Sequence, residues 1–173
     1  NNYIKLNMSW TYKTNEITDV TQFPNNTFGF IYMVKHKPTN KSYIGKKYLF
    51  HNQKKKLGKK ETQLLKEERK LQGLRGATPK TKQITKESNW KTYYGSQNDI
   101  KFLLSEGKKD EFERVILKCV QTKKQLTYFE LKYQMIYQVL EKPDEFFNFN
   151  ILGKFFTKDL EGLVFESIVE DTK

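Results

Sequence analysis

Residues 29–47 contain two runs rich in aromatic and β-branched residues, separated by a turn segment. The first run reads Gly-Phe-Ile-Tyr-Met-Val-Lys, the second reads Ser-Tyr-Ile-Gly-Lys-Lys, and Pro38 and Asn40 lie between them. Runs of this composition on either side of a Pro/Asn turn are typical of a β-hairpin. The chain is therefore expected to build its sheet around this hairpin.

Each predicted strand carries one tyrosine, Tyr32 in the first and Tyr43 in the second. With the turn at about residues 37–40, the simplest register places the two tyrosines opposite each other. Alternation along a strand adds Gly45 and Lys47 to the same face. Gly45 leaves bare backbone there, which a ligand could approach closely. The alternative is an ordinary aromatic hairpin, since tyrosine is common in strands.

Composition narrows the class of partner. The formal net charge is +12 over 173 residues, which favours a polyanion, either nucleic acid or an anionic membrane. No apolar run approaches about 18 residues and no signal peptide is visible, so we expect no membrane association and a cytoplasmic location. The single cysteine, Cys119, excludes an intrachain disulfide, and two histidines cannot form a His-rich metal site. The 14% aromatic content predicts an aromatic-rich core.

Residues 51–88 form the most basic part of the chain. Twelve Lys and Arg against four Glu leave +8 in this stretch, two thirds of the total net charge. We interpret it as an insertion with a helix at about 61–71. A solvated basic surface is the alternative to nucleic-acid contact. The candidate contacts to nucleic acid in this segment are Lys54, Lys55, Lys56, Lys59, Lys60, Arg69 and Arg75.

The remaining segments predict an α+β fold with a small central, mainly antiparallel β-sheet flanked by helices. One domain is expected over residues 1–173, with its core at about 28–152. The predicted parts are an N-terminal arm 1–27 packed on the domain edge, with a short strand at 3–6; a helix 99–106 capped by Ser96 or Asn98; a strand 111–120; a helix 123–140; an extended segment 146–153; and an acidic tail 157–173.

Two tripeptides in the hairpin resemble the core motif of the GIY-YIG nuclease family. They are Phe30-Ile31-Tyr32, which has Phe where Gly is usual, and the complete Tyr43-Ile44-Gly45. Downstream, the Trp-Lys-Thr-Tyr-Tyr-Gly-Ser segment that begins at Trp90 is similar to that of a phage-type branch of the family. The resemblance covers roughly residues 28–152, interrupted by the basic insertion.

Glu130 is the candidate metal ligand. Leu126, Tyr133 and Tyr137 lie four residues before, three after and seven after it, so its carboxylate points beside the packed helix face. A carboxylate in that position needs a partner. The partner could be Lys123 or Lys124, or a hard cation such as Mg²⁺. The resemblance implies the second choice, with Mg²⁺ or Mn²⁺ held by Glu130.

The resemblance also implies an Asn near the end of the domain and an Arg on the helix after the second tripeptide. Asn148 matches the first position, although Asn150 competes with it and a turn-forming Asn is the alternative. The Arg is not evident. We expect Lys47 to take its place, with Lys46 second; Arg69 and Arg75 are other candidates, and His51 is a weaker one for proton transfer.

The activity implied is hydrolysis of DNA phosphodiester bonds with one divalent ion. Tyr32 or Tyr43 would help to deprotonate the attacking water, and a cation such as Lys47 or the metal would lower the tyrosine pKa from its usual value near 10. The substrate would be double-stranded DNA. A homing-type or phage-encoded, host-DNA-degrading enzyme in the host cytoplasm is the analogous role, and a homodimer is one way to cut both strands. Two rivals remain open: a catalytically inactive nucleic-acid-binding protein on the same fold, and an RNA-binding or ribosome-associated protein.

Overall fold

A computed structural model gives the structure of the chain and describes residues 9–162. The short strand predicted at 3–6 and most of the acidic tail predicted at 157–173 lie outside this range. The chain divides into two compact units. The second unit is Phe50–Ser88, which spans the segment interpreted as an insertion, and the first unit comprises the residues before and after it. Each unit is described by itself.

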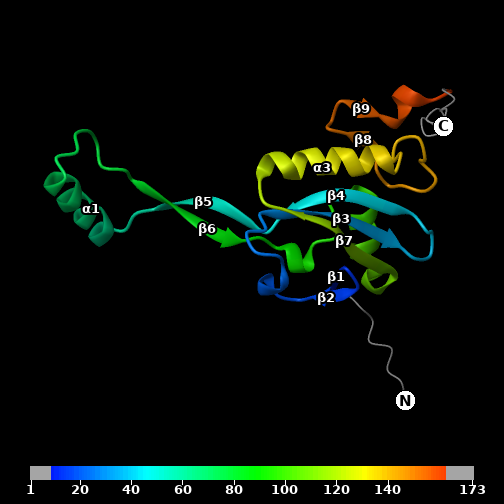
Figure 1. Cartoon of the computed structure of the whole chain (residues 1–173), viewed down its shortest axis with the longest axis horizontal. Helices are drawn as coiled ribbons and strands as arrows, with labels where there is room; N and C mark the ends of the chain where they lie inside the picture. The colour runs from blue at the N-terminus through cyan, green and yellow to red at the C-terminus, as the bar shows by residue number, and fades with distance from the viewer. Residues whose placement is uncertain (1–8, 163–173) are drawn as a thin grey trace, which may run out of the picture. The chain divides into compact units, whose positions relative to one another are not determined.

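The first unit is built on a five-stranded sheet with strand order β2-β1-β7-β3-β4 (Figure 1). The central strands β7, β3 and β4 are antiparallel neighbours, and β1 joins β7 in parallel. This arrangement confirms the predicted α+β fold with a mainly antiparallel sheet. The strands are β1 Trp10–Tyr12, β2 Asn15–Ile17, β3 Gly29–His36, β4 Ser42–Tyr48 and β7 Phe112–Val120.

The N-terminal arm contributes two strands to the sheet instead of only packing on its edge. β1 and β2 form a three-residue hairpin pair, and Trp10 is buried at 1% exposure. Strands this short carry too little alternation of apolar and polar residues to be predicted from sequence. They form here because β1 pairs with the edge of β7.

The hairpin register differs from the prediction by two residues. Tyr32 pairs with Gly45, and Tyr43 pairs with Val34. The amide of His36 donates to the Lys41 carbonyl and closes the turn, which sets the pairing of the whole hairpin. A shift of two residues preserves alternation, so Tyr43 and Gly45 still lie on the face of Tyr32.

Helix α3, Lys123–Ile136, covers one face of the sheet (Figure 1). Leu126 packs there in a hydrophobic cluster with Ile31 and Ile44. The helix is four residues shorter than predicted, because Gln138 adopts a left-handed conformation with φ 54°. Ile136, the last residue of α3, is exposed.

The opposite face of the sheet is covered by aromatic side chains. Trp10 packs edge-on against Phe30 and Tyr32, while Phe23 stacks on Phe30 and meets Trp90 edge-on. Trp90 begins the segment that leads to helix α2, Asn98–Ser105. The cap of α2 is the side chain of Gln97, which accepts from the amide of Ile100, and not Ser96 or Asn98 as predicted.

A small hairpin follows α3. Its strands are β8 Asn150–Ile151 and β9 Phe155–Phe156, within and just after the segment predicted as extended. The isolated bridge between Ser42 and Phe146 ties the start of this segment to β4.

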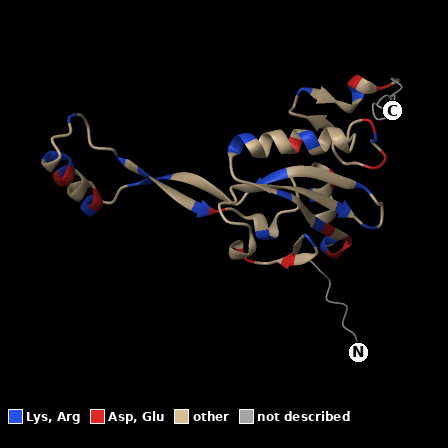
Figure 2. Cartoon of the chain, viewed as in Figure 1, with Lys and Arg blue, Asp and Glu red and all other residues tan. Residues whose placement is uncertain are grey.

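The second unit is a two-stranded hairpin, β5 Phe50–Lys56 and β6 Thr81–Glu87, which carries helix α1, Lys59–Leu71, between its strands. Every residue in this unit is exposed or half-buried. Figure 2 shows Lys and Arg along both strands and the helix. Across residues 9–162, no helix combines the length and the apolar character needed to cross a bilayer.

Candidate active site

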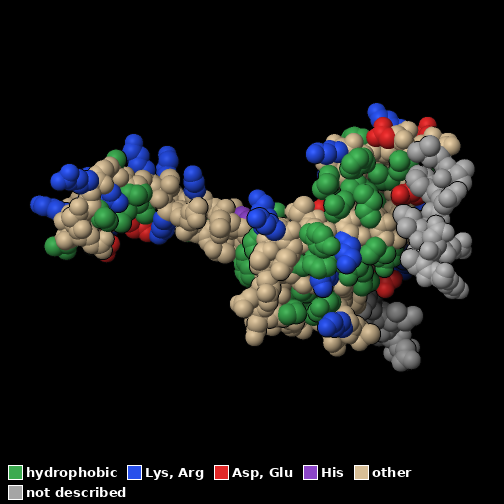
Figure 3. All heavy atoms as spheres, turned by 45° about the horizontal axis from the view of Figure 1, so that its top comes forward, with side chains coloured by type: hydrophobic (Ala, Val, Ile, Leu, Met, Phe, Trp, Pro, Cys, Tyr) green, Lys and Arg blue, Asp and Glu red, His purple; other side chains and the backbone are tan. Residues whose placement is uncertain are grey.

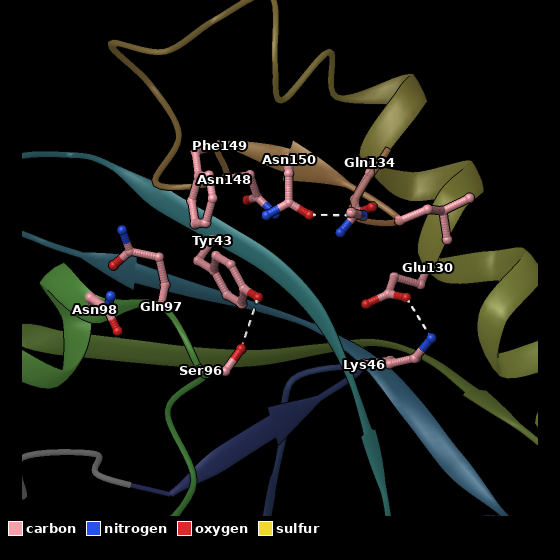
Figure 4. A pocket seen from close by; sticks show the side chains of 12 residues that line it. Tyr43, Lys46, Ser96, Gln97, Asn98, Glu130, Gln134, Asn148, Phe149 and Asn150 are labelled. Carbon is pink, nitrogen blue, oxygen red and sulfur yellow. Dashed lines mark hydrogen bonds and ion pairs between the residues drawn. The ribbon is translucent and has the colours of Figure 1, made fainter. Parts of the chain in front are cut away.

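A cavity of about 490 Å³ opens along β4, the edge strand of the sheet (Figure 4). Because β4 has no strand beyond it, side chains from both faces of the sheet reach this edge. The residues that line the cavity come from β4, the start of α2, α3 and the β8–β9 hairpin: Tyr43, Lys46, Ser96, Gln97, Asn98, Glu130, Gln134, Asn148, Phe149, Asn150, Leu152 and Gly153.

The carboxylate of Glu130 lies in this cavity, paired with Lys46. Lys46 Nζ is 2.8 Å from Glu130 Oε2, and the two side chains are 26% and 16% exposed. Lys46 also donates to the hydroxyl of Thr127 at 3.3 Å. The partner of Glu130 in this structure is therefore Lys46, and not Lys123 or Lys124, the two lysines proposed as alternatives.

Lys47 lies on the other face of the sheet, away from Glu130. Its Nζ donates to Asn89 Oδ1 at 2.7 Å and sits 3.8 Å from the centre of the Tyr93 ring. Burial lowers the pKa of Lys47. Of the two lysines that follow Gly45, the structure thus brings Lys46 to the cavity and not Lys47, the first choice from the sequence.

Tyr43 closes the other end of the cavity. Its hydroxyl lies 3.4 Å from the hydroxyl of Ser96 at the start of α2 (Figure 4). Burial raises the pKa of Tyr43, the contact with Ser96 lowers it in part, and the charge of Glu130 adds to the rise.

The hydroxyl of Tyr32 occupies a slot made by two glycines. A Cβ on Gly45 would lie 2.6 Å from this hydroxyl, and a Cβ on Gly95, whose φ is 117°, would lie 3.5 Å from it. Glycine at both positions therefore lets the phenol reach the backbone of β4. Burial raises the pKa of Tyr32 well above its usual value, and neighbouring Tyr93 and Tyr43 raise it further. The ammonium of Lys47, predicted to lower a tyrosine pKa, lies against the ring of Tyr93 instead.

Asn148 is buried and binds the backbone of β4. Its Oδ1 accepts from the amide of Ile44 at 2.9 Å, and its Nδ2 donates to the carbonyl of the same residue at 2.8 Å. Gln134 of α3 donates to that carbonyl as well, at 3.1 Å. Together the two side chains satisfy the amide and carbonyl of Ile44 on the open edge of β4, as a neighbouring strand would. Asn148 is therefore a positioning residue for the Tyr43-Ile44-Gly45 tripeptide.

Two residues that position the site were missed from the sequence. Gln134 lies in α3 between Tyr133 and Met135, and its side chain is buried against β4. Arg114 is 4% exposed in β7, and its Nη1 donates to the carbonyls of Lys91 and Tyr93 at 2.9 and 3.0 Å. Desolvation lowers the pKa of Arg114 to about 10. The sequence signal for Arg114 is weak, because β7 also carries the charged residues Glu113 and Lys118 among its apolar ones.

The donors around Glu130 suit a hard cation that keeps most of its water. The cavity offers one carboxylate, that of Glu130, whereas the amide of Asn98 and the hydroxyl of Ser96 lie toward its Tyr43 end (Figure 4). Within residues 9–162 there is no group of three or more His, Cys, Asp or Glu side chains placed to hold a metal. A single carboxylate with neutral oxygen donors is the chemistry of a site for a hard divalent cation that keeps several waters.

The predicted nucleic-acid contacts other than Lys46 lie in the second unit. Lys54, Lys55 and Lys56 are exposed on β5, and Lys59 and Lys60 begin α1. Arg69, in the last turn of α1, donates to the carbonyl of Arg75. The ring of His51 contacts Gln53 within β5 at 2.9 Å.

Comparison with known families identifies this architecture. Residues 10–151 match the family model described as "Putative endonuclease segE, GIY-YIG domain". The chain belongs to the GIY-YIG nuclease family. No curated protein and no solved structure matches the chain. The match begins at β1 and ends at β8, so it includes every element that lines the cavity except the turn after β8.

The GIY-YIG domain gives the chain an endonuclease fold and a nuclease role. Its one departure in the first tripeptide, Phe30 in place of Gly, has a structural explanation. Phe30 is completely buried and packs between Phe23 and Trp10, so it fills the aromatic layer under the sheet. Phe30 does not line the cavity.

Proposed function

We propose that this chain is a Mg²⁺-dependent endonuclease that hydrolyses phosphodiester bonds of double-stranded DNA, with Mn²⁺ able to replace Mg²⁺. The observation that supports this most directly is the convergence of Glu130, Lys46 and Tyr43 on one cavity at the edge of β4. A carboxylate, an ammonium and a phenol are the groups needed to hold a cation, bind a phosphate and move a proton.

Glu130 would hold the divalent ion, which when bound supplies positive charge to polarise the phosphate and stabilise the leaving oxygen. With its carboxylate partner engaged by the ion, the Lys46 ammonium would be available to bind a phosphate oxygen as a point charge. We propose Lys46 in the place of the family's helix Arg. Lys47, held by Asn89 and Tyr93, supports the Tyr32 side of the sheet.

One of the two tyrosines would take the proton of the attacking water. Tyr43 lines the cavity, whereas Tyr32 is buried with its hydroxyl against Gly45. In the free protein both pKa values are raised, so each phenol is protonated at neutral pH and cannot accept a proton; positive charge nearby would favour its ionised form. Asn148 would keep Tyr43-Ile44-Gly45 in place through its two hydrogen bonds to Ile44.

The second unit would bind the DNA backbone. Its +8 charge lies on an exposed hairpin and helix that have no core of their own. Lysines on such a surface contact phosphates without reading bases, and their binding weakens steeply with salt.

The biological setting follows by analogy with the family. A site of this kind cuts one strand per event, so cleavage of both strands takes two successive nicks or a homodimer. We propose that the protein is a homing-type endonuclease or a phage-encoded enzyme that degrades host DNA. It would act in the cytoplasm, which is the host cytoplasm if the chain is phage-encoded.

The test compares the wild type with Glu130→Gln on supercoiled plasmid, with Mg²⁺ and with EDTA. We expect the wild type to nick the plasmid only with Mg²⁺, and Glu130→Gln to bind DNA but not cut it. If both proteins bind DNA and neither cuts it, the chain is the catalytically inactive binding protein considered above. Tighter binding to RNA than to duplex DNA would favour the RNA-binding alternative.

A further inference from the structure

Two large apolar side chains lie exposed at the rim of the candidate active site. Phe149 and Leu152 both line the cavity, and they are 55% and 47% exposed. In Figure 4 the Phe149 ring lies near Tyr43, at the end of the cavity opposite Lys46 and Glu130. Figure 3 shows hydrophobic side chains gathered on the face that carries α3 and the β8–β9 hairpin. The polar centre of the site therefore has an apolar border.

The backbone that carries these side chains is held in place. Phe149 follows Asn148, whose side chain makes both hydrogen bonds to Ile44, and the carbonyl of Phe149 accepts from the amide of Thr157. Two further bonds close the turn, from the Gly153 amide to Asn150 Oδ1 and from the Lys154 amide to the Ile151 carbonyl. Phe149 is thus presented on a fixed support.

Leu152 adopts a conformation that leucine rarely takes. Its φ is 56°, in the left-handed region that favours Gly or Asn. Strain of this kind persists where the surrounding structure enforces it, and it is concentrated at functional sites. A leucine that is both strained and exposed stabilises neither the turn nor the core, so its position at the cavity needs another explanation.

We propose that Phe149 and Leu152 form an apolar wedge that contacts a base next to the scissile phosphodiester. This inference rests on the proposed function. A nucleotide offers a phosphate and the flat apolar face of its base. Lys46 and Glu130 provide for the phosphate, and an exposed ring and leucine at the rim match the base. Stacking on a base face is tolerant of sequence, so the wedge positions DNA without selecting one base.

The first test places a fluorescent reporter at the wedge. The native tryptophans Trp10 and Trp90 are buried at 1% and 0% exposure, so they form a constant background. The experiment is run in EDTA so that the DNA is not cut. In Phe149→Trp, we expect duplex DNA to quench the fluorescence of the new indole and to protect it from quenching by acrylamide. The control is Phe155→Trp in the same hairpin. Phe155 is 51% exposed but does not line the cavity, so its emission should stay unchanged.

The second test measures cleavage. Phe149→Ala should lower kcat/KM on duplex DNA about tenfold, which is at the low end of the cost of losing one base–aromatic stack. Phe155→Ala should leave kcat/KM unchanged. A mismatch at the cut site should restore much of this loss, because its bases are already partly unstacked. Leu152→Asn relieves the backbone strain, so it should raise the melting temperature while slowing cleavage.

The outcomes separate this inference from the proposed function. Mg²⁺-dependent nicking with no change in the emission of Phe149→Trp overturns the wedge and leaves the nuclease proposal standing. Concentration-dependent self-association that Phe149→Ala abolishes would make the apolar border an interface between copies, and would also overturn the wedge. Absence of both DNA binding and cleavage overturns both proposals.

Discussion

Lys46 Nζ lies 2.8 Å from Glu130 Oε2, across the edge of the sheet. The two residues come from different elements, β4 and α3, and the ion pair occupies the carboxylate proposed to hold the metal. A divalent ion must therefore compete with an ammonium group of the protein itself. When the ion is bound, the same ammonium is free to bind phosphate, so metal and substrate binding should be coupled.

Replacing the lysine tests this competition. In Lys46→Met the carboxylate of Glu130 has no ammonium to displace, so Mn²⁺ should bind about threefold more tightly, as expected for a partly exposed pair. The nicking rate should nevertheless fall about 100-fold, because the positive charge proposed to bind the phosphate is removed. Mn²⁺ affinity is measured by calorimetry and the rate on plasmid. Lys47→Met is the matched control, and its Mn²⁺ affinity should equal that of the wild type.

Gly45→Ala should destabilise the fold and impair cleavage. The added Cβ would lie 2.6 Å from the Tyr32 hydroxyl and 2.9 Å from the Tyr43 ring, so either the buried Tyr32 or the half-buried Tyr43 has to move. We expect a loss of about 2 kcal/mol in the free energy of unfolding, typical of overpacking. Gly58→Ala is the control: its nearest contact is 3.7 Å, and it should change stability by less than about 0.5 kcal/mol. Urea titrations of both variants measure this difference, and equal stability would mean that the slot around Tyr32 accommodates an added methyl group.

Asn148→Asp removes one hydrogen bond and keeps the other. The carboxylate can still accept from the Ile44 amide, but it faces the Ile44 carbonyl without a proton to donate. We expect a loss of about 2 kcal/mol, since a buried acceptor then opposes a charge. Asn150→Asp retains an acceptor for the Gly153 amide, so it should remain close to wild type in thermal unfolding. Similar melting temperatures for the two variants would contradict the role of Asn148 on β4.

The pH dependence of cleavage should reveal the general base. Burial raises the pKa values of both Tyr32 and Tyr43 above their usual value near 10, so each is protonated at neutral pH in the free protein. Because only the ionised phenol accepts a proton, kcat/KM should rise about tenfold per pH unit from pH 6.5 toward 9.

Tyr32→Phe and Tyr43→Phe, measured over the same pH range, assign this role. The variant that lacks the base should lose the slope as well as most of the rate, whereas the other should keep the slope at a reduced rate. A pH-independent rate for the wild type would exclude a tyrosine base.

The face shared by Tyr32, Tyr43 and Gly45 could be predicted because alternation along a strand is local. The register could not, since it depends on how the turn closes between His36 and Lys41, and the predicted pairing was wrong by two residues. Similarly, the position of Glu130 beside the packed face of its helix followed from spacing, but its partner did not.

The chain by itself determined the family motif, the antiparallel hairpin, the basic character of residues 51–88 and the carboxylate on the long helix, because each depends on periodicity or charge over a few neighbouring residues. Tertiary structure alone decided that Lys46 and not Lys47 meets Glu130, and that Asn148 and Gln134 hold the carbonyl of Ile44. Adjacent residues on an edge strand point to opposite faces, and only the packing of α3 against one of these faces determines which lysine reaches the site.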